Sequence, residues 1–493
     1  MLDQTQTPLL TSLKACAQRP HAAFYTPGHK RGQGAPACLR ELLGNEALRA
    51  DLPELAELDN LFTPEGVILE AQILAAEAFG AEQTWFLANG STCGLEAAIL
   101  AVCNPGDKII VPRNVHRSVV AGLVLAGARP VFVEPDNAPD LGLALGVKAE
   151  TVAMALSHHP DVRAVLVVSP TYHGISSDLE AIADLAHAHG LPLLVDEAHG
   201  PHFVFHPHLP TPALRQGSDL VVQSTHKVLA ALSQASMLHV QGDRVDRDRL
   251  QAALQITQST SPNYLLLASL DAARHQMATE GEALLSQTLA LAQTLRDQLT
   301  QMPGLRVVAP SDITHYASVQ DLDLTRITLD VAALGMTGLE ADTILNDTLG
   351  VTVELAELRH LTLVVSLGNT PADGERCMEG FRQVVAQGRP VPLALPPVRS
   401  STQCPVTLPP MSPRDAFFAA TTTLAATDAL GYLSAETLSP YPPGIPVMMA
   451  GEVITAEAIA HLNTVAQQGG YITGASDPTL VTLKVIQTPT KTP

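Results

Sequence analysis

Four short polar segments in the first half of the chain carry residue types that could do chemistry together. They are residues 89–94, His116, residues 196–200 and residues 224–227. Each one directly follows a run of apolar residues that is typical of a buried β-strand. In open parallel sheets, ligands bind beyond the carboxyl ends of the strands. The spacing therefore predicts that the four segments lie at strand ends of one sheet.

The first segment has the composition of an anion site. It reads Asn-Gly-Ser-Thr-Cys-Gly and stands between the apolar run WFLA and the helical pattern LEAAILAVC. Small residues let backbone N–H groups approach an anion, and the helix that follows presents its positive end. Ser91 and Thr92 add hydroxyl donors. A plain helix cap would use the same residues, so this motif alone does not establish phosphate binding.

A carboxylate and a lysine follow two other apolar runs. Asp196 ends the run PLLV, where a buried carboxylate needs a partner. A pyridinium nitrogen would be such a partner, and Asp196 would keep that nitrogen protonated. Lys227 ends DLVVQSTH one strand–helix–strand step later, where its amine could react with an aldehyde. A helix cap or metal ligand for Asp196, and a surface position for Lys227, are the ordinary alternatives.

The remaining segment contributes a flat ring. His116 follows the run KIIVP and could stack on a planar cofactor, although a surface loop histidine would look the same. An anion cradle, a stacking ring, a carboxylate and a lysine in this order are the components of a pyridoxal phosphate (PLP) site. We therefore expect a PLP enzyme in which Lys227 holds the cofactor.

The elements that must position these residues are short apolar runs that alternate with helical patterns. Strands are expected at residues 83–88, 108–112, 129–134, 163–169, 192–197 and 219–225. Asp178 or Ser177 can cap the helix that precedes the fifth run, and Gly190 can end it. This alternation predicts an α/β fold whose large domain has three layers, α/β/α, around a mainly parallel sheet.

Composition shifts suggest how the chain divides into domains. A helical stretch is expected at residues 280–305, and the runs RITLDVAAL and LTLVVSLGN read as strands of a smaller α/β domain. The expected divisions are an N-terminal lead-in (1–70), a PLP-binding large domain (71–280), a small α/β domain (281–390), a Pro-rich linker (391–413) and a C-terminal domain (414–493).

Composition also excludes several classes of protein. The net charge is −20, which argues against a nucleic-acid or anionic-membrane partner. The six cysteines form no CxxC pair, so neither a disulfide framework nor a metal site is expected. Because the sequence shows no signal peptide and no apolar run long enough for a span, we expect a cytoplasmic protein.

Beyond the four segments, the sequence resembles the Orn/Lys/Arg decarboxylase family along nearly its whole length. The similar stretches include FYTPGHKRG (24–32), LFTPEGVILEAQILAAEAFGAEQTWFLANGST (61–92), SPTYHG (169–174), LPLLVDEAHGPHFVFH (191–206), QSTHKVLAALSQASMLH (223–239) and SPYPPGIPVMMAGEVIT (439–455). The likeness is greatest to short biosynthetic, cyanobacterial-like members. It implies the aspartate-aminotransferase-like fold of fold-type-I PLP enzymes, without the extra N-terminal domain of longer members.

By position, this resemblance implies a role for each site residue. Lys227 would bind the cofactor covalently, Asp196 would pair with the pyridinium nitrogen, and His116 would stack on the ring. The phosphate would be held or flanked by four polar side chains, Ser91, Thr92, Ser224 and His226.

Two further residues take their expected roles from the resemblance alone. His199 would lie beside the cofactor ring. Glu452 would help to recognise the distal cation of the substrate, in its own site or in that of a partner subunit. The chain departs from the family at Ala450, where proline is frequent, and at Cys93, where a smaller residue is common.

The resemblance implies α-decarboxylation of a basic amino acid in polyamine biosynthesis by a homodimer or a higher homo-oligomer. Arginine, which gives agmatine, is placed ahead of lysine, which gives cadaverine, because the likeness is greatest to short biosynthetic members. No residue in the sequence measures the length of the substrate, so lysine stays open as well. An aminotransferase or another PLP-dependent lyase on the same fold stays open. A catalytically silent PLP-fold binding or regulatory protein also stays open, although the presence of both Asp196 and Lys227 argues against it.

Overall fold

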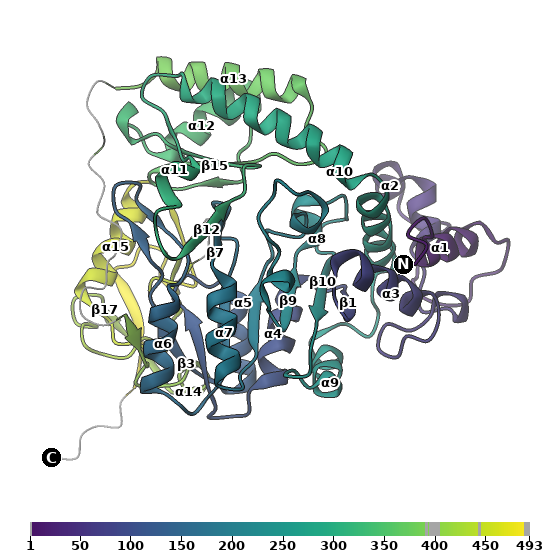
Figure 1. The fold of residues 1–493 in the computed structure, drawn as a ribbon, viewed down its shortest axis with the longest axis horizontal. Coiled ribbons are helices and arrows are strands. Elements are labelled where there is room, and N and C mark those ends of the chain that lie inside the picture. Colours follow the sequence, from purple (N-terminus) through teal and green to yellow (C-terminus); the bar gives the residue numbers. More distant parts are fainter. Residues whose placement is uncertain (1, 390–392, 394–404, 442–444, 488–493) are drawn as a thin grey trace. The chain divides into compact units, whose positions relative to one another are not determined.

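The computed structural model describes residues 2–389, 393, 405–441 and 445–487. The chain forms two compact units (Figure 1). Unit 1 contains Met1–Ala101 and Leu194–Ser286, and unit 2 contains Val102–Leu193 and Gln287–Pro493. The geometry is determined within each unit, whereas the position of one unit relative to the other is not.

Unit 1 combines an N-terminal helical segment with four strands. Its helices are α1 (Pro8–Gln18), α2 (Ala37–Ala50), α3 (Val67–Phe79), α4 (Gly90–Val102), α8 (Thr225–Val228), α9 (Arg247–Thr257) and the first part of α10 (Tyr264–Thr300). Its strands are β1 (Gln83–Leu87), β8 (Leu193–Asp196), β9 (Leu220–Gln223) and β10 (Ser236–Val240), in the spatial order β1-β10-β9-β8.

Three of the four strands of unit 1 run in the same direction. β8 and β9 are parallel, with Asp196 opposite Val222, and β10 is antiparallel to both β9 and β1. Every residue of β8 and β9 is buried, which explains why these two strands read as mainly apolar runs rather than alternating ones. The parallel pair β8 and β9 therefore delivers its two carboxyl ends to the same edge.

The N-terminal lead-in is fixed to unit 1 by a buried ion pair on α10. The Asp271 carboxylate accepts hydrogen bonds from the backbone N–H groups of Leu9 and Leu10 at 3.1 and 3.2 Å, at the start of α1. Arg274 is fully buried beside Asp271 and donates to the Gln4 carbonyl at 2.8 Å. The carboxylate thus satisfies N–H groups that a helix start leaves unpaired.

Unit 2 contains a parallel group of strands and several smaller sheets. The parallel strands are β6 (Val162–Val168), β2 (Lys108–Pro112) and β3 (Arg129–Val133), with β16 (Val406–Thr407) antiparallel beside β3. A four-stranded antiparallel sheet has the order β11-β13-β15-β14, from β11 (Arg306–Val307), β13 (Arg326–Asp330), β15 (His360–Val364) and β14 (Leu355–Ala356).

Two-stranded sheets complete the strands of unit 2. They pair β12 (Val319–Leu322) with β7 (Ile175–Ser177), β17 (Thr421–Ala425) with β20 (Thr482–Ile486), β18 (Ser439–Tyr441) with β19 (Tyr471–Thr473), and β4 (Asn137–Ala138) with β5 (Leu143–Ala144). The helices are α5 (Arg117–Ala126), α6 (Ala149–His158), α7 (Leu179–Ala188), the last part of α10, α11 (Pro310–Ile313), α12 (Gly338–Leu349), α13 (Pro371–Ala386), α14 (Pro413–Phe418) and α15 (Ala456–Gln467).

Two hydrophobic cores organise these smaller sheets. The end of α10 packs with α12 and α13 against the four-stranded sheet, in a core that includes Leu299, Ile327 and Phe381 (Figure 1). The helix α15 packs against β17, β19 and β20 through residues such as Leu462 and Val485. Each core buries one apolar face of a sheet under helices, as an α/β or α+β layer requires.

The six strands expected from the sequence are confirmed to within two residues, as β1, β2, β3, β6, β8 and β9. The cap is also confirmed, because the Asp178 side chain accepts from Ala181 N at 3.2 Å at the start of α7, and Gly190 with φ 70° lies just beyond its end. The expected helix at residues 280–305 is wrong in its start, since α10 begins at Tyr264. Its first turns carry Asp271 and Arg274, whose buried polar side chains hide the apolar periodicity.

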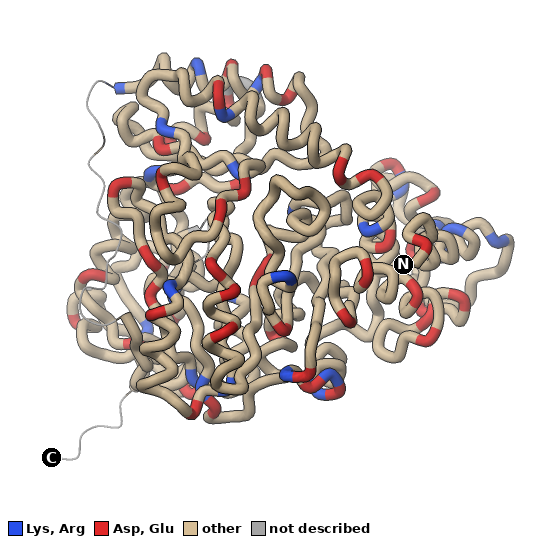
Figure 2. Tube along the Cα trace, viewed as in Figure 1, with Lys and Arg blue, Asp and Glu red and all other residues tan. Residues whose placement is uncertain are grey.

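Other expectations fall partly outside what the structure describes. Most of the Pro-rich linker at 391–413 lies outside the described residues, and the predicted domain boundaries stay a prediction. None of the helices in the described ranges combines the length and apolar character that a membrane span requires. Acidic residues outnumber basic ones, 49 to 29, and are spread over both units (Figure 2).

Candidate functional site

The carboxyl ends of β8 and β9 bring several predicted residues together in unit 1. Asp196 is the last residue of β8, and Ser224 is the N-cap residue of the short helix α8, which contains Lys227. Because β8 and β9 are parallel neighbours, these residues leave the sheet at the same edge (Figure 1). This is the arrangement that the spacing of the polar segments predicts.

Lys227 and His199 are in direct contact. The Lys227 Nζ lies 2.9 Å from the His199 Nε2. His199 is 5% exposed, whereas Lys227 is half-buried. An ammonium group can only donate, so Nε2 is the acceptor of this hydrogen bond. The lysine amine is therefore held at a defined point, next to a base that can take up its proton.

Asp196 is a buried carboxylate with spare capacity to accept hydrogen bonds. It is 4% exposed and accepts from Ala198 N at 3.1 Å, which is its one hydrogen bond within the described chain. Burial raises its pKa above the ordinary value, and the positive charge of Lys227 partly opposes this rise. A second donor would complete the site, and the N–H of a protonated pyridine ring is of the right kind.

Two of the predicted phosphate-holding residues touch each other. The Ser224 Oγ donates to the Ser91 Oγ at 2.7 Å, on the first turn of α4. Thr92 is exposed beside Ser91, and the His226 Nδ1 lies 3.0 Å from the Ala235 carbonyl, to which it donates. The hydroxyl pair at the positive end of a 13-residue helix suits a phosphate.

Close packing behind this helix depends on a glycine. A Cβ at Gly94 would come within 2.7 Å of the Leu87 Cδ1 and 2.9 Å of the Val222 Cγ1. Any larger residue would therefore push α4 away from β1 and β9. In addition, the Thr225 Oγ1 is buried without a hydrogen-bond partner among the described residues. A bound group with polar oxygens next to Ser224 would be a natural partner for this hydroxyl.

These observations fit PLP in unit 1. Ser91, Ser224 and the start of α4 would hold the phosphate. Asp196 would pair with the ring nitrogen, and Lys227 would bind the aldehyde. The donor set contains one anion site, one buried carboxylate and one reactive amine, which are the complementary groups that this cofactor requires.

Sequence reasoning missed a buried polar network behind Asp196. The Glu197 carboxylate accepts from Ala213 N and from the Gln223 Nε2, both at 2.8 Å. The Gln223 Oε1 lies 3.1 Å from the His239 Nε2, and the His239 Nδ1 lies 2.8 Å from the Thr84 hydroxyl. The signal in the sequence is a polar residue inside each of three mainly apolar strands, namely Thr84 in β1, Gln223 in β9 and His239 in β10.

Burial sets the charge state of this network. It raises the pKa of Glu197 to about 8, despite the opposing hydrogen bonds from Gln223 and Ala213. It also lowers the pKa of His239 to about 3. Both groups are therefore neutral near pH 7, which avoids the cost of burying isolated charges beside the site.

Two predicted residues lie in unit 2, so no distance from them to the residues of unit 1 is determined. His116 is the N-cap residue of α5 at the end of β2, where its Nδ1 accepts from the Ser118 hydroxyl at 2.8 Å and from Ser118 N at 3.3 Å. These contacts fix the ring at a strand end, as expected for His116. Its stacking on the cofactor stays a prediction.

Glu452 forms an ion pair that the sequence did not reveal. Its Oε1 and Oε2 both accept from the guanidinium of Arg113, Oε2 at 2.8 Å, and Oε2 also accepts from Met449 N at 2.9 Å. Arg113 further donates to the Val447 carbonyl at 3.3 Å. The two side chains are 15% and 17% exposed, and Glu452 raises the pKa of Arg113 against the effect of burial.

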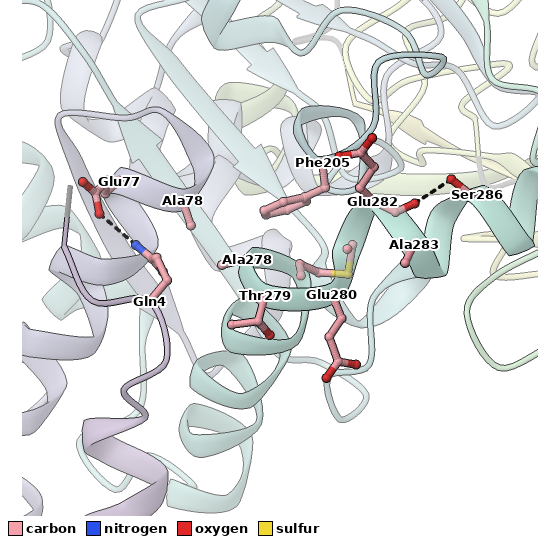
Figure 3. Close-up of a pocket in the computed structure, with 12 residues that line it drawn as sticks. Gln4, Glu77, Ala78, Phe205, Ala278, Thr279, Glu280, Glu282, Ala283 and Ser286 are labelled. Atoms are coloured by element: carbon pink, nitrogen blue, oxygen red, sulfur yellow. Dashed lines mark hydrogen bonds between the residues drawn. The ribbon is translucent and has the colours of Figure 1, made fainter.

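A cavity of about 910 Å³ in unit 1 lies away from the predicted residues. It is lined by Gln4 and Glu77 on one side and by Phe205 and the middle of α10 on the other (Figure 3). Gln4 donates to Glu77 at 3.0 Å across its edge. None of the predicted site residues lines this cavity.

Comparison with known proteins places this geometry in a family. Residues 7–373 match the model of the Orn/Lys/Arg decarboxylase major domain, and residues 400–472 match that of the C-terminal domain. The chain is 39% identical to arginine decarboxylase of Bacillus subtilis over 99% of both chains. It is 26% identical to constitutive lysine decarboxylase of Escherichia coli, over 93% of this chain and 76% of that one.

A solved structure supports the same fold. Lysine decarboxylase A from Pseudomonas aeruginosa superposes with a TM-score of 0.82 at 23% identity, over 98% of this chain and 81% of the other. The expected fold-type-I α/β fold is confirmed. The chain belongs to the Orn/Lys/Arg decarboxylase family. The family consists of PLP-dependent carboxy-lyases, which confirms the enzyme class and the cofactor that the strand-end residues predicted.

Proposed function

We propose that this protein removes the α-carboxylate of arginine as CO2 and releases agmatine, with lysine as the second candidate substrate. The observation that carries the proposal is the contact between Lys227 and His199 beside the buried Asp196 at the ends of β8 and β9. The greater identity to an arginine decarboxylase, 39% against 26% for a lysine decarboxylase, supports arginine.

Five residues of unit 1 would have defined roles in the reaction. Bound PLP supplies the electron sink for the pair left behind when the bond to the carboxylate breaks. Asp196 holds a proton on the ring nitrogen and so maintains that sink. The Lys227 amine must be neutral to react, and the His199 Nε2 at 2.9 Å can accept its proton. Ser91 and Ser224 anchor the phosphate.

Four further residues would complete the site. Thr92 and His226 flank the phosphate, and His116 stacks on the ring. Glu452 would act as a positioning residue, because both of its carboxylate oxygens accept hydrogen bonds from Arg113. Direct contact between Glu452 and the substrate, as expected from the sequence, stays a prediction.

Two arginines argue against the aminotransferase alternative. An aminotransferase usually clamps the substrate carboxylate with an arginine. In unit 2, Arg113 is engaged by Glu452, and Arg359 is engaged by Asp330 at 2.7 Å and by the Asp140 carbonyl at 2.7 Å. Neither guanidinium is left to bind a carboxylate, which suits an enzyme that must expel this group.

We further propose a cytoplasmic location and a homodimer or higher homo-oligomer. None of the five cysteines within the described residues is part of a disulfide, which suits a reducing compartment. Gel filtration with light scattering would test the assembly, and a monomer at micromolar concentration would contradict it.

One experiment tests the activity. The PLP-loaded protein is incubated separately with arginine, lysine and ornithine, and CO2 and the product amines are measured. We expect kcat/KM to be highest for arginine. Transfer of the amino group to a 2-oxo acid without CO2 would identify an aminotransferase, and absence of any turnover would favour a silent binding protein.

A further inference from the structure

The loop that carries Ser91 is held at its first residue by two glutamine side chains of unit 1. Ala88 directly follows β1 and is 3% exposed, so both of its backbone polar groups need partners. Its N–H donates to the Gln258 Oε1 at 2.9 Å, and its carbonyl accepts from the Gln234 Nε2. Backbone pairing of β1 with β10 ends at the residue before Ala88. The two side-chain amides therefore fix the chain at the point where the sheet no longer does.

Gln234 has an unfavourable backbone conformation. Its φ is 84°, in the left-handed region that favours glycine and that a long side chain rarely adopts. Such a conformation costs free energy and persists where the surrounding contacts require it, often at a functional site. Here the Gln234 carbonyl accepts from the Ser236 hydroxyl at 3.1 Å and lies 3.7 Å from the position that a Cβ at Gly90 would occupy. Gln234 thus lies against the Ser91 loop with its backbone as well as with its amide.

The residue after Gln234 joins this contact to the helix of Lys227. The Ala235 carbonyl accepts from His226 N at 3.2 Å and from the His226 Nδ1 at 3.0 Å. His226 directly precedes Lys227 on α8. Two adjacent residues therefore connect the start of the Ser91 loop to the helix that carries the lysine. Because the phosphate of the cofactor is expected at that loop and its aldehyde at the lysine, this connection sets the distance between the two ends of the site.

We propose that Gln234 is a positioning residue for the cofactor phosphate. Together with Gln258 it fixes the Ala88 peptide, and so holds the Ser91 hydroxyl and the start of α4 at the distance from Lys227 that the cofactor spans. The proposal rests on the PLP site proposed above and assigns to Gln234 no contact with the cofactor itself. A role limited to shaping the turn before β10 is the alternative, and the two differ in what happens to PLP binding.

Two variants separate the amide of Gln234 from its backbone conformation. Gln234→Met removes the N–H donor, keeps the length of the side chain and adds no charge. Gln234→Gly also removes the donor but relieves the backbone at φ 84°. In both variants the buried Ala88 carbonyl loses this hydrogen bond, which is costly for a buried acceptor. We expect the dissociation constant of PLP, measured by absorbance on the full-length protein, to rise about tenfold in both variants.

Phosphorus NMR of the PLP-loaded protein gives a second readout that needs no turnover. The resonance of the cofactor phosphate should shift in both variants, because the Ser91 hydroxyl and the start of α4 move relative to the phosphate. At saturating PLP, kcat for arginine should stay within a few-fold of the parent, because Asp196 and Lys227 stand on β8 and α8, which the variants leave intact. A loss of PLP affinity without a comparable loss of kcat is the expected signature of positioning at the phosphate.

A matched control lies at the other end of β10. Gln241 directly follows this strand, and its Nε2 donates to the Leu214 carbonyl at 2.7 Å and to the Ser218 carbonyl at 2.8 Å. Gln241→Met therefore removes comparable amide–carbonyl contacts from the same sheet, away from the carboxyl ends of β8 and β9. It should lower stability in urea unfolding as the Gln234 variants do, yet keep the dissociation constant of PLP within about twofold of the parent.

Three results would overturn the proposal. Retention of the parent's PLP affinity and phosphorus spectrum by either Gln234 variant would refute the role of the amide. An equal loss of PLP affinity in Gln241→Met would mean that general destabilisation of the sheet explains the effect. Absence of PLP binding by the unsubstituted protein would refute the site and this proposal together. Since both readouts need bound PLP and no turnover, they decide on Gln234 even if the protein releases no CO2 and the proposed function fails.

The second glutamine keeps the test decisive if neither Gln234 variant folds. Gln258 stands directly after α9, is 8% exposed and holds the other side of the same peptide. Gln258→Met removes its acceptor and leaves Gln234 unchanged, so the dissociation constant of PLP should rise by a similar factor and the phosphorus resonance should shift. Parent values for both quantities in Gln258→Met would show that the position of the Ala88 peptide does not affect the cofactor, and the proposal would fail.

Discussion

Two largely buried carboxylates, Asp196 in unit 1 and Glu452 in unit 2, differ in what their surroundings supply. Asp196 interacts with the positive charge of Lys227 within its own unit and needs one further N–H donor. Glu452 is already engaged by the Arg113 guanidinium and by Met449 N. We therefore expect changes at Asp196 to affect the cofactor, and changes at Glu452 to affect mainly the stability of unit 2.

The largest effect is expected where the cofactor is held. Lys227→Ala should abolish both decarboxylation and the absorbance of bound PLP, because Lys227 is the lysine that follows a strand end beside Asp196 and contacts His199. Reduction with borohydride followed by peptide mapping should label Lys227. Lys108→Ala is a suitable control. Lys108 stands on β2 and forms an ion pair with Asp161, so the Lys108→Ala variant should remain active. Labelling at Lys108 or Lys30 would refute the assignment.

The next effect concerns the ring nitrogen. Asp196→Asn should fold and bind PLP, yet lose about 10²–10³-fold in kcat, because an amide cannot keep that nitrogen protonated. The substrate KM should change little. The measurement is steady-state kinetics alongside the cofactor spectrum. Activity within a few-fold of the parent would mean that Asp196 is a structural residue and that the comparison between the two carboxylates fails.

The site residues that could be predicted from the sequence and those that could not differ in their positions in the fold. Asp196, Ser224 and Lys227 follow apolar strands, and parallel strands deliver their ends to one edge, so pattern alone could place them together. Glu452 stands outside any helix or strand, where no periodicity marks a site. Arg113 meets Glu452 across 339 positions, a pairing that only the fold creates.

The strands themselves were predictable for a related reason. Buried parallel strands are continuous apolar runs bounded by polar residues, and β2 at Lys108–Pro112 has that form. The helix α10 was misplaced because Asp271 and Arg274 are buried as a pair, which interrupts the expected apolar face. A prediction that assumes buried residues to be apolar therefore misses buried polar pairs.

The Glu452→Gln variant should show whether Glu452 positions Arg113 or contacts the substrate directly. Glu452→Gln should leave the Arg113 charge buried without its partner and lower the free energy of unfolding by about 3–5 kcal/mol. Because the two segments that this ion pair joins would loosen, KM for arginine and lysine should both rise by a similar factor. The double variant Arg113→Gln with Glu452→Gln should recover stability, as measured by urea unfolding. If Glu452 instead binds substrate directly, KM rises in the single variant without loss of stability.

The smallest effect on activity is expected at Glu197, the neighbour of Asp196. Each member of the chain from Glu197 through Gln223 and His239 to Thr84 can reverse its hydrogen bonds, since an amide can flip, an imidazole can change tautomer and a hydroxyl can rotate. Glutamine at 197 therefore mimics the neutral acid, and Glu197→Gln should keep kcat/KM within a few-fold of the parent.

The consequence of Glu197→Gln should instead be seen in how stability depends on pH. Burial raises the pKa of Glu197 to about 8 in the folded protein, from an ordinary value of 4.5 that applies when the chain is unfolded. Between these values the folded state keeps a proton that the unfolded state has lost, so the free energy of unfolding falls as pH rises from 4.5 to 8. The contribution is complete below pH 4.5 and is lost by about pH 8, and its size is at most a few kcal/mol.

Because the pKa of Asp196 is also raised, the parent and the variant must be compared at each pH in urea unfolding. The Glu197→Gln variant should gain stability relative to the parent as pH rises through this window. The matched control Glu375→Gln changes an exposed residue of α13 and should follow the parent. A variant whose difference from the parent is constant with pH would show that Glu197 is ionised in the folded protein, and Asp196 would then share its strand end with a second buried anion.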